Sequence, residues 1–121
     1  MAVDDEPEFL KILSEWFSMN GFEIITFDDS RKALEELNKD RAFDVVILDF
    51  LMAPYDGLEV LKKIKTNEKT RTLPVFILSQ MGEESYKVMA KKLGAADYLI
   101  KSEFSLKELE KRIRVLIEAK E

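Results

Sequence analysis

The sequence predicts an α/β fold in which a doubly wound, parallel five-stranded sheet carries helices on both faces. Two observations lead to this prediction: short apolar runs alternate with segments of helical periodicity, and glycine or proline residues separate most of them. Five alternations of strand and helix imply right-handed crossovers and parallel strands. The length of 121 residues suits one domain, so residues 1–121 are expected to form a single unit.

Five short apolar segments are predicted to be strands. The first contains only residues 1–3, so we expect a shortened first strand. The other four are rich in β-branched and aromatic residues, which is typical of strands covered on both faces. They are "FEIITF" (22–27), "FDVVILD" (43–49), "PVFILS" (74–79) and "ADYLIK" (96–101).

Apolar residues at helical spacing predict a helix after each strand. Pro7 suits a first helical turn, Ser30 is expected to cap the second helix, and Ser105 with Glu108 forms a capping box for the last. The apolar stripes are Phe9, Leu10, Leu13, Trp16 and Phe17; Ala33, Leu34 and Leu37; Leu58, Leu61 and Ile64; Val88, Met89 and Leu93; and Leu106, Leu109, Ile113, Leu116 and Ile117.

Composition excludes several classes of function. The balance of 19 basic against 24 acidic residues gives a net charge of −5, so we expect no direct nucleic-acid partner. The chain has no cysteine and no histidine, which excludes disulfides, thiolate zinc sites and histidine-based catalysis and leaves oxygen ligands for any metal. No apolar run is long enough to cross a bilayer, so no membrane contact and a cytoplasmic location are expected.

Polar side chains follow the predicted strands at the edge where function gathers in parallel sheets. Asp4 and Asp5 follow the first strand and Asp49 ends the third, whereas Ser79 and Lys101 end the fourth and fifth. If the first and third strands are neighbours, the three carboxylates converge, and a hard cation such as Mg²⁺ would relieve their repulsion. Mg²⁺, the ammonium group and the hydroxyl could then share the charge of a phosphoryl group on Asp49, which would act as nucleophile.

Taken singly, these residues have ordinary structural explanations. Asp4 and Asp5 could cap a helix, Asp56 and Gly57 are typical of a turn, and Lys101 is a solvated charge. Only their joint placement at strand ends favours a phosphoacceptor site.

The pieces "VDDE", "VILDFLM", "FILS" and "GAADYLIK", in this order, resemble a response-regulator receiver domain of a two-component system. The resemblance covers essentially the whole chain and implies the flavodoxin-like strand order 2-1-3-4-5. It also implies that the chain acts as a signalling switch rather than as an enzyme on other molecules, catalysing only its own phosphorylation and dephosphorylation.

The resemblance assigns roles to individual residues. It implies that Asp49 is the phosphoacceptor, that Asp5 binds Mg²⁺ directly and Asp4 through water, and that the backbone carbonyl of Leu51 completes the protein's share of the ligands. Three further positions match functional residues of the family: Ser79 is the switch hydroxyl, Tyr98 the coupled aromatic, and Lys101 the site lysine.

The resemblance also implies partners. The phosphodonor would be a histidine kinase or a histidine phosphotransfer protein. Phosphorylation would change a face built from the fourth helix, fifth strand and fifth helix, which would bind a downstream protein or the chain's own effector domain. A homodimer through this face, with Asp97 paired to a basic residue such as Arg112, is left open.

The chain departs from the family pattern at two positions that frame the site. Ala53 precedes Pro54 where the family has proline one residue earlier, and Ser102 follows Lys101 where a proline in a cis peptide is usual. We expect a rigid turn at the first position and a trans bond at the second.

Three alternatives are weighed against the phosphorylated switch. A pseudo-receiver would keep the fold and act as a phosphate-independent interaction module. A Mg²⁺-dependent phosphohydrolase needs a second acid where this chain has Leu51, and a flavodoxin-like electron carrier needs a phosphate loop that "DDEPEF" does not supply. The resemblance implies that the positions of Leu51 and Met81 flank the path of the hydrolytic water, and their apolar side chains predict slow self-dephosphorylation.

Overall fold

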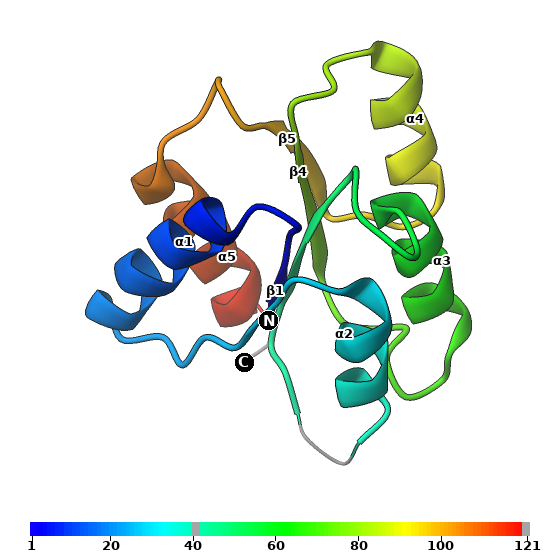
Figure 1. The fold of residues 1–121 in the computed structure, drawn as a ribbon, viewed down its shortest axis with the longest axis horizontal. Coiled ribbons are helices and arrows are strands. Elements are labelled where there is room, and N and C mark those ends of the chain that lie inside the picture. The colour runs from blue at the N-terminus through cyan, green and yellow to red at the C-terminus, as the bar shows by residue number, and fades with distance from the viewer. Residues whose placement is uncertain (40–41, 120–121) are drawn as a thin grey trace.

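The computed structural model describes residues 1–39 and 42–119, and its strands form one parallel sheet in the order β2-β1-β3-β4-β5 (Figure 1). Both the parallel arrangement and this order are as predicted. The elements, in chain order, are β1 (Ala2–Val3), α1 (Pro7–Met19), β2 (Thr26–Phe27), α2 (Ser30–Leu37), β3 (Val46–Asp49), α3 (Gly57–Thr66), β4 (Val75–Ser79), α4 (Glu84–Lys92), β5 (Asp97–Ile100) and α5 (Leu106–Ala119).

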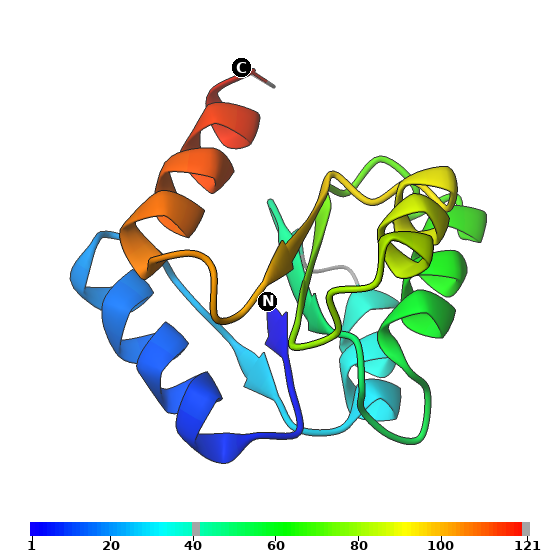
Figure 2. The same cartoon turned by 90° about the horizontal axis from the view of Figure 1, so that it is seen from above.

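Helices cover both faces of the sheet. Figure 2 shows α1 and α5 on one side and α2, α3 and α4 on the other. Alternate residues of β3 serve the two layers: Val46 and Leu48 pack with the α2, α3 and α4 side, and Ile47 packs with the α1 and α5 side. Burial on both faces explains why the strand segments are continuous apolar runs.

The first strand is as short as predicted, yet it lies between β2 and β3 in the sheet. Backbone hydrogen bonds extend its pairing beyond the two strand residues. The Ile47 N–H donates to the Met1 carbonyl over 2.8 Å, and the Asp4 N–H donates to the Phe27 carbonyl over 3.1 Å. The position of Asp4 is therefore set by the sheet.

The second strand is shorter than the predicted range of 22–27 and contains only Thr26–Phe27. It is an edge strand with a neighbour on one side, so less of it is held in the ladder. Before the strand, the chain packs under the α1 and α5 layer instead: the Phe22 ring meets Phe17 edge-on at 5.0 Å between centroids, and Arg114 lies over the same ring.

The predicted cap of the second helix is wrong by one residue. The carboxylate of Asp29 accepts the N–H groups of Arg31 and Lys32, so Asp29 is the N-cap of α2. Ser30 is buried instead, and its hydroxyl accepts the Tyr55 N–H over 2.9 Å. Two neighbouring polar residues can both satisfy the start pattern, and tertiary contacts decide between them.

The other two predicted helix starts agree with the structure. Pro7 opens α1, and the Ser105 hydroxyl accepts the Glu108 N–H over 3.1 Å at the start of α5. This is one of the two hydrogen bonds of the predicted capping box; the Glu108 carboxylate pairs with Arg112 instead. The prediction of a weak apolar stripe on the fourth helix is wrong in part. Val88 and Met89 are 43% and 49% exposed, and the residue of α4 that is buried is Ala90.

The start of α3 presses against the end of β3. The Asp56 carboxylate accepts the Glu59 N–H, and the Glu59 carboxylate accepts the Asp56 N–H, which completes a capping box. Gly57 donates its N–H to the Phe50 carbonyl over 2.7 Å, and a Cβ at Gly57 would lie 2.4 Å from the Asp49 carbonyl oxygen. Asp56 and Gly57 therefore begin a helix, with Asp56 as its N-cap, where a turn was expected, and only glycine fits this approach.

Gly57→Ala should therefore destabilise the domain by about 1–3 kcal/mol, because the obstacle is backbone that cannot move without disturbing the end of β3. Urea denaturation measures the change. Gly82→Ala is the matched control, since the added carbon would meet only the Ile100 side-chain tip at 3.2 Å. Equal stability losses in the two variants would contradict the prediction.

Candidate functional site

Four carboxylates gather at the carboxyl ends of the central strands. Asp4 follows β1 and Asp49 is the last residue of β3, which pairs directly with β1. Asp4, Asp5, Glu6 and Asp49 each contribute one oxygen to a group whose members all lie within 4.8 Å of one another. Asp4 and Asp49 are buried, whereas Asp5 and Glu6 are exposed. The sequence-predicted carboxylates therefore converge, and Glu6 joins them.

Lys101 brings the positive charge to this group from the residue after β5. Its ammonium group lies 2.7 Å from Asp4 Oδ2, 3.0 Å from Glu6 Oε1 and 3.5 Å from Asp49 Oδ1. The Phe9 ring lies beneath the ammonium at 4.4 Å from its centroid. The Lys101 side chain is only 7% exposed, so this is a buried cation rather than a solvated surface charge.

Negative charge exceeds positive charge around the two buried carboxylates. Burial, and then the charge of Asp4, raise the pKa of Asp49 from 3.8 to about 7. Burial also raises the pKa of Asp4, although its hydrogen bond from Lys101 opposes the change. Burial alone would lower the pKa of Lys101, but its hydrogen bonds to Asp4 and Glu6 and the nearby carboxylate charges outweigh that effect and raise it. One ammonium does not neutralise four acids.

Ser79 and Tyr98 meet at one backbone position. Ser79 ends β4, one residue beyond Leu78, the register partner of Asp49. Its buried hydroxyl accepts the Met81 N–H over 2.9 Å, and the Tyr98 hydroxyl donates to the Met81 carbonyl over 2.6 Å. The two predicted switch residues are thus connected through the backbone of Met81. The sequence did not indicate this connection.

The loop after β3 is held by hydrogen bonding to the start of α2. Leu51, two residues after Asp49, is 56% exposed. The Ser30 N–H donates to the Ala53 carbonyl over 3.3 Å, and the peptide bond between Ala53 and Pro54 is cis. The predicted rigid turn agrees with this bonding. The bond between Lys101 and Ser102 is trans, as expected.

Sequence reasoning missed Glu6 and Phe9 as members of the site. Glu6 follows two predicted ligands, and the acidic run "DDE" was the available signal. No sequence pattern shows that its carboxylate reaches a lysine 95 residues away, because that contact depends on the path of the chain after β5.

Helices α4 and α5 carry exposed apolar side chains: Val88 and Met89 on α4, and Val115 on α5. The Arg112 guanidinium pairs with Asp97 and also with Glu108, the latter at 3.0 Å. The pairing of Asp97 with Arg112 therefore forms within one chain, and whether it also forms between two chains stays a prediction.

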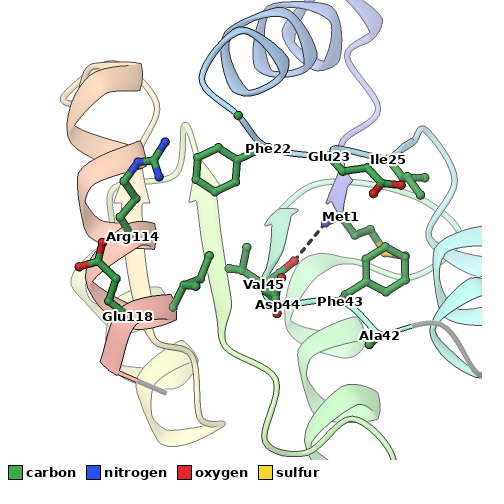
Figure 3. A pocket seen from close by; sticks show the side chains of 12 residues that line it. Met1, Phe22, Glu23, Ile25, Ala42, Phe43, Asp44, Val45, Arg114 and Glu118 are labelled. Atoms are coloured by element: carbon green, nitrogen blue, oxygen red, sulfur yellow. Dashed lines mark hydrogen bonds between the residues drawn. The ribbon is translucent and has the colours of Figure 1, made fainter. Parts of the chain in front are cut away.

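A cavity of about 470 Å³ lies at the amino-terminal ends of β1 and β3, at the opposite end of the sheet from the acidic group (Figure 3). The ammonium group of Met1 donates to the Val45 carbonyl there, over 3.0 Å. Arg114, which lines the same cavity, is engaged by Glu110 and by the Phe22 ring. This cavity holds none of the predicted site residues.

Within residues 1–39 and 42–119, no helix combines the length and the apolar character that a membrane span needs.

Comparisons with known proteins agree on one family. The family model described as "Response regulator receiver domain" matches residues 1–114. The probable transcriptional regulator ycf27 of Guillardia theta is 38% identical over 97% of this chain and 44% of its own length. The transcriptional regulatory protein CpxR of Escherichia coli (strain K12) is 36% identical over 97% of this chain and 48% of its own. The chain thus spans about half the length of these relatives.

Solved structures give the same answer. The receiver domain of the Francisella response regulator 1452 superposes with a TM-score of 0.90 at 29% identity, covering 99% of this chain and 96% of that one. Chemotaxis protein CheY4 of Vibrio cholerae gives a TM-score of 0.86 at 30% identity, covering 95% and 94%. With the predicted strand order present and the family model matched over residues 1–114, this chain belongs to the response regulator receiver domains of two-component signalling.

Proposed function

We propose that this receiver domain is a phosphorylation-activated switch in which Asp49 accepts a phosphoryl group from a phosphohistidine donor in the presence of Mg²⁺. The observation that carries the proposal is the convergence of Asp4, Asp5 and Asp49 around the buried ammonium of Lys101. A histidine kinase or histidine phosphotransfer protein supplies the phosphoryl group, since the chain itself has no histidine.

The donor set fits a hard divalent cation. Carboxylate oxygens from Asp4, Asp5 and Asp49 lie within 4.8 Å of one another. Burial and repulsion between carboxylates raise the pKa values of Asp4 and Asp49, so their charged forms are disfavoured without a further cation. The backbone carbonyl of Leu51 would complete the protein ligands. Mg²⁺ bound there supplies positive charge that lowers the cost of bringing an anionic phosphodonor to an anionic acceptor.

The chemistry on the protein side is a single displacement. A carboxylate oxygen of Asp49 forms a bond to phosphorus while the bond from phosphorus to the donor's imidazole nitrogen breaks, and the nitrogen keeps the electron pair. Lys101 lies 3.5 Å from that carboxylate and provides a point charge for the transferred oxygens. The bond between Asp49 and the phosphoryl group stores the signal.

Ser79 and Tyr98 would convert the phosphoryl group into a change of shape. Phosphoryl oxygens are strong acceptors, so they would attract the Ser79 O–H as a donor, whereas the Ser79 oxygen accepts the Met81 N–H in the unphosphorylated state. The Tyr98 hydroxyl donates a hydrogen bond to the carbonyl of the same Met81. Movement of the turn after β4 would therefore change the position of the Tyr98 ring. Such coupling biases a two-state equilibrium at the face formed by α4, β5 and α5.

The output of the switch is a binding surface. Exposed Val88 and Met89 on α4 and Val115 on α5 offer apolar contact area to a protein partner. Two relatives carry names that describe transcriptional regulators about twice as long as this chain. We therefore propose that the face binds a downstream protein or an effector domain, and that nucleic acid is not a direct partner of the receiver domain itself.

Incubation with acetyl phosphate and Mg²⁺ should add one phosphoryl group to the wild type and none to Asp49→Asn, because the amide is not a nucleophile of the required kind. Intact mass measures the gain. Labelling of both proteins would place the acceptor elsewhere. Labelling of neither would favour a phosphate-independent interaction module.

The raised pKa of Asp49 predicts a pH-dependent stability. Between its usual value of 3.8 and about 7, the folded state binds a proton that the unfolded state has lost, so the free energy of unfolding falls as pH rises through this window. Without divalent cations, Asp49→Asn should therefore raise the melting temperature more at pH 8 than at pH 5, by about 5 °C, which corresponds to roughly 1 kcal/mol in a domain of this size.

Calorimetry at the two pH values tests this. Asp44→Asn, which changes an exposed carboxylate at the opposite end of the sheet, is the control and should show no such difference. Saturating Mg²⁺ should stabilise the wild type more than Asp49→Asn. An equal gain for Asp49→Asn at both pH values would refute a strained, buried carboxylate.

The lifetime of the phosphorylated state should be long, because the side chains two residues beyond Asp49 and Ser79 are Leu51 and Met81, which offer no hydrogen bond to an attacking water. The double substitution Leu51→Asn with Met81→Glu should shorten the phosphoryl half-life about tenfold, or about 1.4 kcal/mol in barrier, which is the size of one hydrogen bond. Decay of the phosphorylated mass after acetyl phosphate is removed gives the half-life. Leu51→Val with Met81→Leu is the apolar control.

A further inference from the structure

Glu6 is the one member of the acidic group that the proposed chemistry leaves without a role. Its carboxylate accepts a hydrogen bond from Lys101 over 3.0 Å, and Asp4 accepts another over 2.7 Å. The distance from the same ammonium to Asp49 is 3.5 Å, longer than either bond. In the unphosphorylated site, Lys101 therefore donates hydrogen bonds to Asp4 and Glu6 and lies farther from Asp49, the residue that would carry the phosphoryl group.

The backbone of Glu6 is held from both sides. Its N–H donates to Asp4 Oδ1 over 2.9 Å, and its carbonyl accepts the Leu10 N–H over 3.1 Å in the first turn of α1. Pro7 follows it as the first helical residue. The side chain therefore leaves from a fixed point beside Lys101 rather than from a mobile loop.

Helix capping does not explain this glutamate. Glu6 occupies the N-cap position of α1, where serine, threonine, aspartate and asparagine are preferred, and its side chain makes no capping hydrogen bond. The carboxylate points to Lys101 instead. Its partner is 7% exposed while Glu6 itself is 51% exposed, so the contact joins a surface acid to a buried cation.

We propose that Glu6 is a positioning residue that restrains Lys101 in the unphosphorylated state and so sets how readily Asp49 is phosphorylated. The inference rests on the proposed function of Asp49. An arriving phosphoryl group must draw the ammonium from Glu6, because phosphoryl oxygens and the Glu6 carboxylate compete for the same N–H donors. Releasing Lys101 in advance removes that competition.

Two substitutions separate this restraint from simple charge. Glu6→Gln weakens the contact and removes the charge. Glu6→Asp keeps the charge, but the shorter side chain suits the N-cap position and would accept N–H groups of the helix instead of reaching Lys101. Both variants should therefore release the ammonium. Glu8→Gln is the matched control, since Glu8 is an exposed acid in the same helical turn.

The experiment measures the rate of phosphorylation by acetyl phosphate, followed by intact mass at saturating Mg²⁺ established for each variant by titration. Glu6→Gln and Glu6→Asp should both react about two- to fivefold faster than the wild type, the range expected for one partly exposed ion pair, and Glu8→Gln should match the wild type. Affinity for beryllofluoride, measured by NMR, should rise in the same two variants.

The other outcomes overturn the inference. A rate for Glu6→Gln equal to or below that of the wild type would mean that Glu6 does not restrain Lys101. Acceleration by Glu6→Gln alone, with Glu6→Asp at the wild-type rate, would show an effect of charge and not of the contact. Labelling of the wild type separates these failures from a failure of the proposed function, in which no variant with Asp49 intact would gain mass.

Discussion

Two buried carboxylates on neighbouring strands, Asp4 and Asp49, share the ammonium of Lys101, and the geometry of the carboxyl edge depends on this arrangement. Burying like charges next to each other costs free energy unless a cation compensates. The parallel pairing of β1 with β3 makes the arrangement unavoidable, because it fixes where both strands end. Lys101 follows β5 on the far side of β4, and its long side chain spans that gap. The sheet thus brings two buried carboxylates together, and the positive charge of Lys101 offsets only part of their repulsion.

The two sides of this edge are held by different kinds of contact. The Asp49 backbone is enclosed by Gly57, whose missing side chain lets α3 approach, and the capping box of Asp56 holds the helix start in place. On the other side of Asp49, Met81 holds the turn after β4: its N–H donates to the Ser79 hydroxyl, and its carbonyl accepts the Tyr98 hydroxyl. The proposed switch would need such an arrangement, with a fixed acceptor beside a turn held by a few exchangeable hydrogen bonds.

Much of the fold and of the site could be predicted because both follow from local patterns. Strands buried on both faces produce continuous apolar runs, and parallel strands bring their carboxyl ends together, so Asp4, Asp49 and Lys101 could be placed from the sequence alone. The errors occur where tertiary contacts override local pattern. Edge position shortens β2, the contact with Tyr55 takes Ser30 from its expected cap, and the contact of Glu6 with Lys101 needs the path of the whole chain.

The raised pKa values on both sides of the ion pair describe one physical state. Lys101 holds its proton more tightly because carboxylates accept its hydrogen bonds, and the pKa of Asp49 is raised by burial and by the charge of Asp4, which the Lys101 ammonium offsets only in part. Glu6 accepts one hydrogen bond from the same ammonium at the surface end of the group. Any cation that enters the group relieves the remaining repulsion between carboxylates, and any group on Asp49 that competes for Lys101 must overcome the contact with Glu6. Cation binding, acceptor chemistry and the position of Lys101 are therefore coupled through charge at a single edge of the sheet.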